Sequence, residues 1–208
     1  GTNPLTFGIP TDEEFPFVLD CATSITQRGK IEVYDREEKE IPEGWVIDKN
    51  GKTRTDTHQI LKDLQKGAAA LTPLGGIGEE TAGYKGYGYA TVVEILSSAL
   101  QGGNFLKMLS GMKDGKRVLY QLGHFFIAIN ISSFIDLKLF KKTAGNILRS
   151  LRVSRKMPGQ SRIYTAGEKE YLTWLKRKDK GVPLNRELQK EVIQMRDELG
   201  LTKYKFSF

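Results

Sequence analysis

The sequence predicts an α/β protein, because segments with the patterns of strands and helices alternate along its 208 residues. Residues 15–19 (FPFVL) are apolar without alternation, as in a strand that is covered on both faces. Residues 122–131 (LGHFFIAINI) are rich in aromatic and β-branched side chains, which favours a second strand. Helical periodicity follows the two segments, over residues 25–37 and 134–153.

The first part of the chain reads as two strands and a helix. Strands at residues 6–9 and 15–19 come first, and Ser24 with Gln27 three residues later resembles the capping box of the helix that follows. Asp20 stands where the second strand ends. A carboxylate there could face a ligand, as in open α/β sheets, or could cap the next turn, and both interpretations stay open.

A turn and a short helix come next. A brief extended piece at residues 45–47 leads into residues 48–51 (DKNG), a strong turn signal. Residues 55–57 (TDT) can cap a helix that Gly67 would end. His58 lies in this polar helix and reads as a surface histidine rather than a catalytic one.

A glycine-rich stretch, residues 83–88 (GYKGYG), opens an apolar run that reads as a buried helix, with four core-facing side chains: Val92, Ile95, Leu96 and Ala99. Glycines there would permit left-handed backbone angles and the close approach of a ligand, beside the charge of Lys85 and the unpaired N–H groups of a helix start. The pattern is neither a Walker loop nor a dinucleotide fingerprint. A ligand loop and a tight turn packed against a sheet both stay open.

The rest of the chain reads as helical after the strand that His124 opens, where a hydrogen-bonded histidine is commoner than a ligand-facing one. The helix over residues 134–153 would turn six apolar side chains inward: Leu137, Phe140, Ala144, Ile147, Leu148 and Leu151. Another helix is expected from about Ala166 to Lys178. The last would follow the cap Asn185 and stop at Gly200.

Composition argues against several classes of protein. No apolar run reaches the roughly 18 residues of a membrane span, and the first residues do not resemble a signal peptide, so a soluble, cytoplasmic protein is expected. The single cysteine, Cys21, cannot form an internal disulfide and reads as a buried, inert thiol. The two histidines lack the spacing of a zinc site.

The net charge of +7 raises the question of nucleic-acid binding. Eight basic residues gather between residues 138 and 162, without an acidic residue among them: Lys138, Lys141, Lys142, Arg149, Arg152, Arg155, Lys156 and Arg162. No zinc-finger or RRM motif accompanies them. A solvated helix face, or a site for a small phosphate or carboxylate ligand, explains them more simply than nucleic acid does.

Six motifs follow one another along the chain: GTNP at 1–4, PFVLDCATS at 16–24, RGKI at 28–31, PEGW at 42–45, GYKGYG at 83–88 and GHFFIAI at 123–129. Together they resemble the type 2 malate/L-lactate dehydrogenase family, which includes ureidoglycolate, sulfolactate and 2,3-diketogulonate oxidoreductases. The resemblance implies an enzyme that uses NAD or NADP to move a hydride to or from a small 2-oxo or 2-hydroxy acid such as malate or L-lactate. It also implies a homodimer whose fold is a mixed sheet flanked by helices, not a Rossmann fold.

The family's cofactor-contacting segments carry over by motif. They comprise Pro16, Phe17, Val18, Leu19, Asp20, Cys21 and Ala22, then Tyr84 and Lys85, and finally Ala166, Gly167 and Glu168. Many members read P-G-E at the third segment, so Ala166 departs from the pattern while Gly167 and Glu168 keep it. No metal site is implied.

The resemblance also implies a part of the fold that this sequence does not contain. Family members carry, ahead of GTNP, the histidine that donates the proton and most groups that bind the substrate, and neither His58 nor His124 occupies that position. A well-placed general acid contributes roughly 10²–10⁴-fold, so the chain alone is expected to bind cofactor better than it turns over. A separate N-terminal fragment of the same enzyme is a candidate partner.

The sequence thus predicts two regions. Residues 1–132 would form the NAD(P)-binding α/β domain, and residues 133–208 a helical segment that packs back on it. The competing hypothesis is a non-catalytic module that keeps the fold and holds an anionic ligand, or nucleic acid, on the basic segment at residues 138–162.

Overall fold

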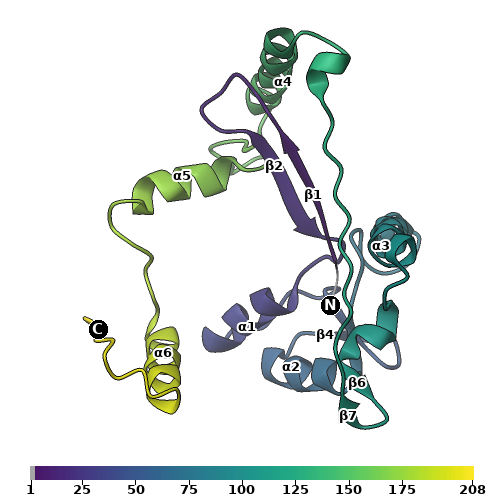
Figure 1. Ribbon diagram of the computed structural model, residues 1–208, viewed down its shortest axis with the longest axis vertical. Coiled ribbons are helices and arrows are strands. Elements are labelled where there is room, and N and C mark those ends of the chain that lie inside the picture. Colours follow the sequence, from purple (N-terminus) through teal and green to yellow (C-terminus); the bar gives the residue numbers. More distant parts are fainter. Residues whose placement is uncertain (1–2) are drawn as a thin grey trace. The chain divides into compact units, whose positions relative to one another are not determined.

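The computed structural model describes residues 3–208 and divides into two compact units, one ending at Gly167 and the other comprising residues 168–208 (Figure 1). The boundary lies later than the one expected after residue 132, so helix α4 (Leu137–Arg152) belongs to the first unit. Helices and short strands alternate through this unit, which confirms the α/β class. The first two residues of the GTNP motif lie outside the described residues.

Strands β1 (Pro4–Ile9) and β2 (Phe17–Ala22) form an antiparallel pair. The strand expected at residues 15–19 starts later and continues past Asp20. Its side chains alternate between exposed Val18 and half-buried Leu19, so the expectation of a strand covered on both faces is wrong for the described chain. Alternation of this kind is typical of an antiparallel hairpin with one solvated face.

The best-packed part of the molecule is a three-stranded antiparallel sheet with two helices. Strand β3 (Val46–Asp48) lies between β4 (Thr53–Arg54) and β5 (Ala69–Leu71). Helices α1 (Arg28–Arg36) and α2 (Thr57–Gln65) pack on each other, and α2 also contacts β5. The buried core side chains between them are Ile31, Ile41, Val46 and Ile60. The segment that follows β5 is therefore attached directly to this packed core.

Local capping chemistry sets several element ends as predicted. The Asp56 carboxylate accepts the Gln59 N–H at 3.0 Å and starts α2, and Gly67 follows that helix with a φ of +67°. Gly51 closes the DKNG turn with a φ of +75°. Asp48 accepts backbone N–H groups in this turn, which holds the pKa of its carboxyl below the ordinary value.

The capping box expected before α1 is wrong. The helix begins at Arg28, with Gln27 in the cap position and no side-chain hydrogen bond there. The Ser24 hydroxyl instead donates to the Thr26 carbonyl at 2.6 Å, and its backbone forms a bridge with Pro73.

Helix α3 (Gly83–Ser98) buries a different face from the one predicted. Its buried residues are Gly83, Gly86, Val93, Ser97 and Ser98. Val92 and Ile95, expected in the core, are 52% and 54% exposed. Small residues on one face let the helix approach its neighbours closely, so the bulky side chains are left on the other. A short 3₁₀ turn, η1 (Ala99–Gln101), continues the helix.

The chain after α3 contains little regular structure. A 3₁₀ helix, η2 (Leu106–Ser110), precedes a hairpin of β6 (Met112–Lys113) and β7 (Lys116–Arg117). Residues 118–130 then run as a long extended trace to η3 (Ile131–Ser133) (Figure 1). The strand expected at residues 122–131 is wrong in that no described strand pairs with it.

Helix α4 is tied to the loop that joins β1 and β2. In this loop, the Asp12 N–H donates to the Lys141 carbonyl of α4 at 3.2 Å. The Arg149 guanidinium of α4 pairs with the loop carboxylates of Asp12 and Glu13 at 3.0 and 3.2 Å. Arg152 also pairs with Glu13. The buried face of α4 is therefore centred on Gly145 and Leu148.

The predicted inward face of α4 is consequently wrong at three positions. Leu137, Ile147 and Leu151 are 39%, 57% and 51% exposed. The helix is rotated because its ion pairs with the hairpin loop, and not its apolar periodicity alone, fix the side that faces inward.

The ion pair of Asp12 predicts an acid-sensitive contribution to stability. Hydrogen bonds from Arg149 hold the pKa of the Asp12 carboxyl below its ordinary 3.8. A lowered pKa contributes stability that is present above the unfolded value and is lost as the pH falls through the folded value. The stability difference between the native chain and Arg149→Met should therefore shrink below about pH 4, as followed by urea unfolding from pH 6 to pH 2. Arg117→Met is the matched control, and a difference that grew on acidification would contradict the assignment.

The second unit consists of α5 (Glu168–Arg177) and α6 (Arg186–Glu198). Asn185 accepts the Leu188 N–H at 2.9 Å and Gly200 follows α6 with a φ of +66°, so both predicted ends of this helix are confirmed. Among the residues that the structure describes, no helix has both the length and the apolar character needed to cross a membrane.

Candidate functional site

Two segments that are far apart in the sequence meet at strand β2. The Val18 N–H donates to the Ala166 carbonyl at 3.2 Å. Gly167 has a φ of +87°, and a Cβ added there would lie 3.1 Å from the Val18 nitrogen and 3.2 Å from the Pro16 carbonyl oxygen. The first and third predicted cofactor segments thus form one junction. Sequence reasoning places each segment by motif, but neither pattern shows that they touch.

Asp20 lies within β2, which continues to Ala22, so the expectation that it stands at the end of the strand is wrong, and its contact with a ligand stays a prediction. Register pairs it with Thr6, whose hydroxyl donates to the Asp20 carboxylate at 2.7 Å. The hairpin extends to Ala22 because this cross-strand pair continues the ladder. Asp20 remains exposed beside Val18, on the same face of the strand.

The other members of the first segment lie between these positions. Phe17, Leu19 and Ala22 are half-buried, and Pro16 is exposed just before the strand. Cys21 is half-buried rather than fully buried, with its sulfur 4.0 Å from the Leu5 carbonyl oxygen.

The second predicted segment stands in the first turn of α3, not in a loop before it. Tyr84 and Lys85 are both exposed, and the Lys85 ammonium lies 5.8 Å from the centre of the Tyr84 ring. The helix begins at Gly83 after Ala82, which has a φ of +60°. A cation near the positive end of a helix dipole suits an anionic ligand. The Gly83 and Lys85 N–H groups there already donate to the Gly78 and Ala82 carbonyls at 3.1 and 3.0 Å.

The glycines of this helix start serve a close backbone approach and not left-handed angles. A Cβ at Gly83 would lie 2.2 Å from the Gly76 carbonyl oxygen, and one at Gly86 would lie 2.2 Å from that of Leu74. The left-handed glycines are instead Gly75, Gly76 and Gly78, in the loop just before. The LGGIG pattern was the signal for this loop, which sequence reasoning passed over.

The loop and the end of β2 are joined by a short backbone ladder. The Ile25 N–H donates to the Thr72 carbonyl at 2.9 Å, and the Leu74 N–H donates to the Thr23 carbonyl at 3.0 Å. The Leu74 backbone also lies against Gly86 of α3. The start of α3 therefore contacts Leu74, which is hydrogen-bonded to Thr23, the residue that follows β2.

A hollow of about 400 Å³ opens beside the start of α3. Its walls are mainly apolar and come from the β3–β5 sheet, the glycine loop and two tyrosines: Ile47, Leu71, Thr72, Pro73, Gly76, Ile77, Gly78, Glu79, Gly83, Tyr84 and Tyr87. Aromatic and aliphatic walls are the kind of surface that binds a flat ring, and the charged side chain among these lining residues is the acidic Glu79.

The predicted site residues do not all come together. Within residues 3–208, no hydrogen bond, ion pair or ring contact joins Tyr84 or Lys85 to the junction at Val18. Glu168 is the first residue of α5 and is 1% exposed.

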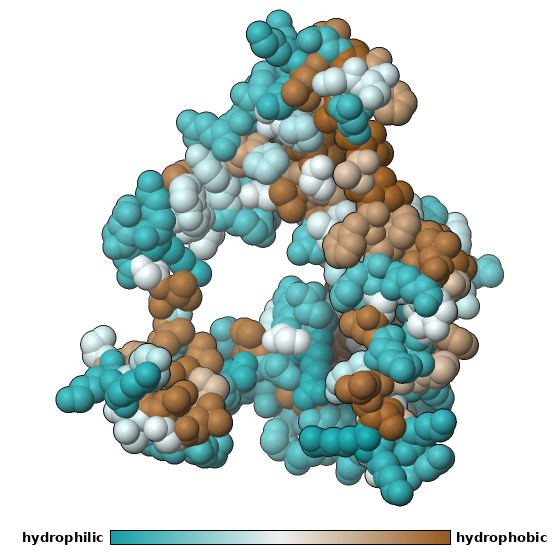
Figure 2. All heavy atoms as spheres, viewed as in Figure 1, coloured by the Kyte–Doolittle hydropathy of each residue, from teal (hydrophilic) through white to brown (hydrophobic). Residues whose placement is uncertain are grey.

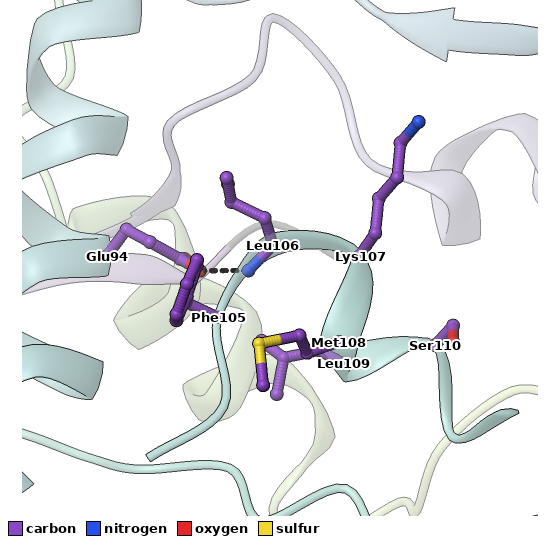
Figure 3. A pocket seen from close by; sticks show the side chains of 7 residues that line it. All are labelled: Glu94, Phe105, Leu106, Lys107, Met108, Leu109 and Ser110. Carbon is purple, nitrogen blue, oxygen red and sulfur yellow. Dashed lines mark hydrogen bonds between the residues drawn. The ribbon is translucent and has the colours of Figure 1, made fainter. Parts of the chain in front are cut away.

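A second hollow, of about 720 Å³, lies beside η2 (Figure 3). Glu94 reaches into it from α3, where its carboxylate accepts the Leu106 N–H at 2.6 Å. Leu106 has a φ of +47°, an uncommon angle for a leucine, and the hydrogen bond holds it there. Figure 3 shows mainly apolar side chains around this contact, so Glu94 has a structural role.

Neither histidine is placed as a catalytic group. His58 is exposed, as predicted, with its Nδ1 3.8 Å from the Asp35 carboxylate. His124 is also exposed, beside Phe126. Among the described residues, no three His, Cys, Asp or Glu side chains are grouped to hold a metal ion.

Comparisons with known proteins identify the family that the chain resembles. The chain is 44% identical to malate dehydrogenase from Entamoeba histolytica, whose crystal structure superposes with a TM-score of 0.90 over 100% of this chain and 56% of that one. It is 39% identical to malate dehydrogenase from Pyrococcus horikoshii, over 97% of this chain and 53% of the relative. It is 29% identical to the NAD(+) ureidoglycolate dehydrogenase of Escherichia coli K12, over 98% and 54%.

The chain therefore spans about half the length of the relatives that it matches. A family model described as malate/L-lactate dehydrogenase matches residues 1–193, nearly all of the 208. This chain belongs to the malate/L-lactate dehydrogenase family.

Proposed function

We propose that the chain carries the cofactor-binding portion of an oxidoreductase that moves a hydride between NAD or NADP and a small 2-oxo or 2-hydroxy acid, such as malate or L-lactate. The observation that carries the proposal is the junction at Val18, where the first and third cofactor segments of the family are held together by a backbone hydrogen bond and Gly167. Family membership supports the reaction class.

The residues present fit a dinucleotide in two respects. Gly167 lets the third segment lie directly against β2, because a Cβ there would be only 3.1 Å from the Val18 nitrogen, and this contact keeps the first and third segments side by side. Lys85 offers a positive charge at the start of α3, where a phosphate would also meet the positive end of the helix dipole. A bound nicotinamide would supply or accept the hydride.

The chain's own residues would bind and orient rather than transfer the proton. Reduction of a ketone needs a proton for the new hydroxyl group. His58 lies in α2 and His124 on the extended segment, and within residues 3–208 no hydrogen bond, ion pair or ring contact joins either of them to the junction. We place the proton donor and the substrate contacts in the half of the family fold that this chain does not span. The family resemblance further supports a cytoplasmic homodimer, which light scattering of the complete enzyme would test.

The alternative is an anion- or nucleic-acid-binding module that uses the basic segment, but part of that segment's charge is neutralised within the fold. Two of its eight basic residues, Arg149 and Arg152, already pair with Asp12 and Glu13 within the fold. Of the remaining six, Lys138, Lys141 and Lys142 lie on α4, consistent with a solvated helix face, and the other three lie in the chain after it.

Charge reversal at Lys85 tests the proposal. We expect Lys85→Glu to weaken NADH or NADPH binding about tenfold or more, because an attraction for phosphate becomes a repulsion. The measurement is a titration of nicotinamide fluorescence with the 208-residue chain. Lys113→Glu makes the same charge change at an exposed position in β6, outside the predicted cofactor segments, and should leave the affinity within twofold.

Two results would count against the assignment. One is an affinity that Lys85→Glu leaves unchanged. The other is strongly salt-dependent DNA binding without any binding of nicotinamide nucleotide, which would favour the alternative module.

A further inference from the structure

Residues 119–130 form an extended segment whose apolar side chains face solvent. Phe126 is 86% exposed, and six neighbours are exposed too: Leu119, Tyr120, Leu122, Phe125, Ile127 and Ile129. Figure 2 shows apolar surface of this kind on the first unit. Contiguous apolar surface on this scale marks an interaction site.

One end of the segment is firmly attached to the end of α3. A Cβ at Gly123 would lie 1.9 Å from the Ser97 carbonyl oxygen. The Gln101 side chain donates to the His124 carbonyl at 2.5 Å and accepts the His124 N–H at 3.2 Å. This amide thus takes both hydrogen bonds that a neighbouring strand would make to His124.

The following residues have no such partner. Within residues 3–208, the N–H and C=O groups of residues 125–129 make no backbone hydrogen bond. Their sequence, FFIAI, has the aromatic and β-branched composition of a strand. Backbone groups in apolar surroundings are almost always paired, and an exposed apolar edge is a template for another strand.

Helix α3 supports the same conclusion from its side chains. Its inner face is already packed, yet its outer face carries Val92 and Ile95, each more than half exposed. A helix that is apolar on opposite faces is normally buried on both. The outer face of α3 is therefore also expected to pack against another part of a protein.

The relatives indicate which part of the fold would pack on these apolar surfaces. The Entamoeba malate dehydrogenase matches this whole chain with a TM-score of 0.90, but only 56% of that protein is matched. A further portion of the fold, nearly as large, lies outside the matched half. A second copy of this chain would bring another unpaired apolar edge but not this portion.

We propose that residues 125–129 pair, strand to strand, with the portion of the dehydrogenase fold that this chain does not span, and that the outer face of α3 packs against the same portion. Backbone hydrogen bonds would supply affinity, and Phe126 and Ile127, which point to opposite sides of the strand, would each enter apolar surroundings. The inference rests on family membership and not on the proposed cofactor site.

Complementation tests the pairing. The probe is the portion of the Entamoeba malate dehydrogenase outside the matched region, coexpressed with the 208-residue chain. We expect a one-to-one complex in which the amides of residues 125–129 exchange hydrogen at least tenfold more slowly than in the chain alone, as measured by mass spectrometry. Neither readout depends on bound cofactor.

Matched variants distinguish pairing through this segment from nonspecific hydrophobic association. Phe126→Asp should weaken the complex at least tenfold, whereas Val153→Asp, at an equally exposed apolar position (84%), should leave it within twofold. Ile127→Pro removes a backbone donor and should also abolish the slowed exchange. Both Phe126 and Val153 are exposed in the chain alone, so circular dichroism should show the fold unchanged.

Three results would overturn the proposal. The first is failure of the two polypeptides to associate, and the second is a complex without slowed exchange at residues 125–129. The third is slowed exchange in the chain alone that rises with its own concentration, because the occupant would then be a second copy.

Discussion

Gly86→Ala is expected to destabilise the first unit by about 3 kcal/mol, near the upper end for overpacking. The new Cβ would lie 2.2 Å from the Leu74 carbonyl oxygen and 2.4 Å from its nitrogen. Both atoms are backbone, and Leu74 is held by its hydrogen bond to the Thr23 carbonyl, so neither can move aside cheaply. The start of α3 would have to shift away from the glycine loop, and Lys85 would shift with it.

Gly88→Ala is the matched control for this change. It lies in the same helix, and a Cβ there would meet nothing within 4 Å. Alanine is favoured over glycine inside a helix by up to about 1 kcal/mol, so this variant should be slightly more stable than the native chain. The measurement is thermal unfolding by circular dichroism, with Gly86→Ala expected to lower Tm by about 6–12 °C. Equal Tm values for the two variants would show that α3 does not contact Leu74 in this way.

Features set by neighbouring residues were predictable from the sequence. The caps at Asp56 and Asn185 and the stops at Gly67 and Gly200 each depend on a side chain and a backbone group within a few positions. Their chemistry is the same wherever the helix lies in the fold, so the pattern is sufficient.

Features set by distant contacts were not predictable in the same way. Val92 and Ile95 have helical spacing and were assigned to the core, but the side of α3 that is buried depends on the fit of Gly83 and Gly86 against the loop. The face of α4 likewise depends on Asp12 and Glu13, more than 130 positions away in the chain. Periodicity shows that a helix has an apolar face, not which element covers it.

The candidate site could likewise be predicted only in part from the sequence. The motifs predicted which segments belong to it, through the family resemblance. Spacing alone could not show that Ala166 would accept the Val18 N–H, or that Tyr84 and Lys85 would stand in a helix rather than a loop. The segment at residues 125–129 has the composition of a strand but no partner among the described residues, because a strand depends on a neighbour that local sequence does not supply.

Gly167→Ala is expected to disturb both stability and cofactor binding, because this glycine closes the junction at Val18. Its φ of +87° is strained for alanine, which costs about 1–2 kcal/mol. The added Cβ would also press on the Val18 nitrogen at 3.1 Å and the Pro16 carbonyl oxygen at 3.2 Å, which adds about 1 kcal/mol or more. The two cofactor segments would have to separate.

Gly159→Ala isolates the contact from the strain. Gly159 has a similar φ of +78°, and a Cβ there would meet nothing within 4 Å. Both variants should be destabilised by the strained backbone. Only Gly167→Ala should lose further stability and also bind nicotinamide nucleotide about fivefold or more weakly, which corresponds to about 1 kcal/mol of binding free energy. Urea unfolding and fluorescence titration measure the two effects. If both variants lost stability equally and bound nucleotide equally well, the junction between β2 and residues 166–167 would not be part of the cofactor site, and the function proposed for this chain would lose its main structural support.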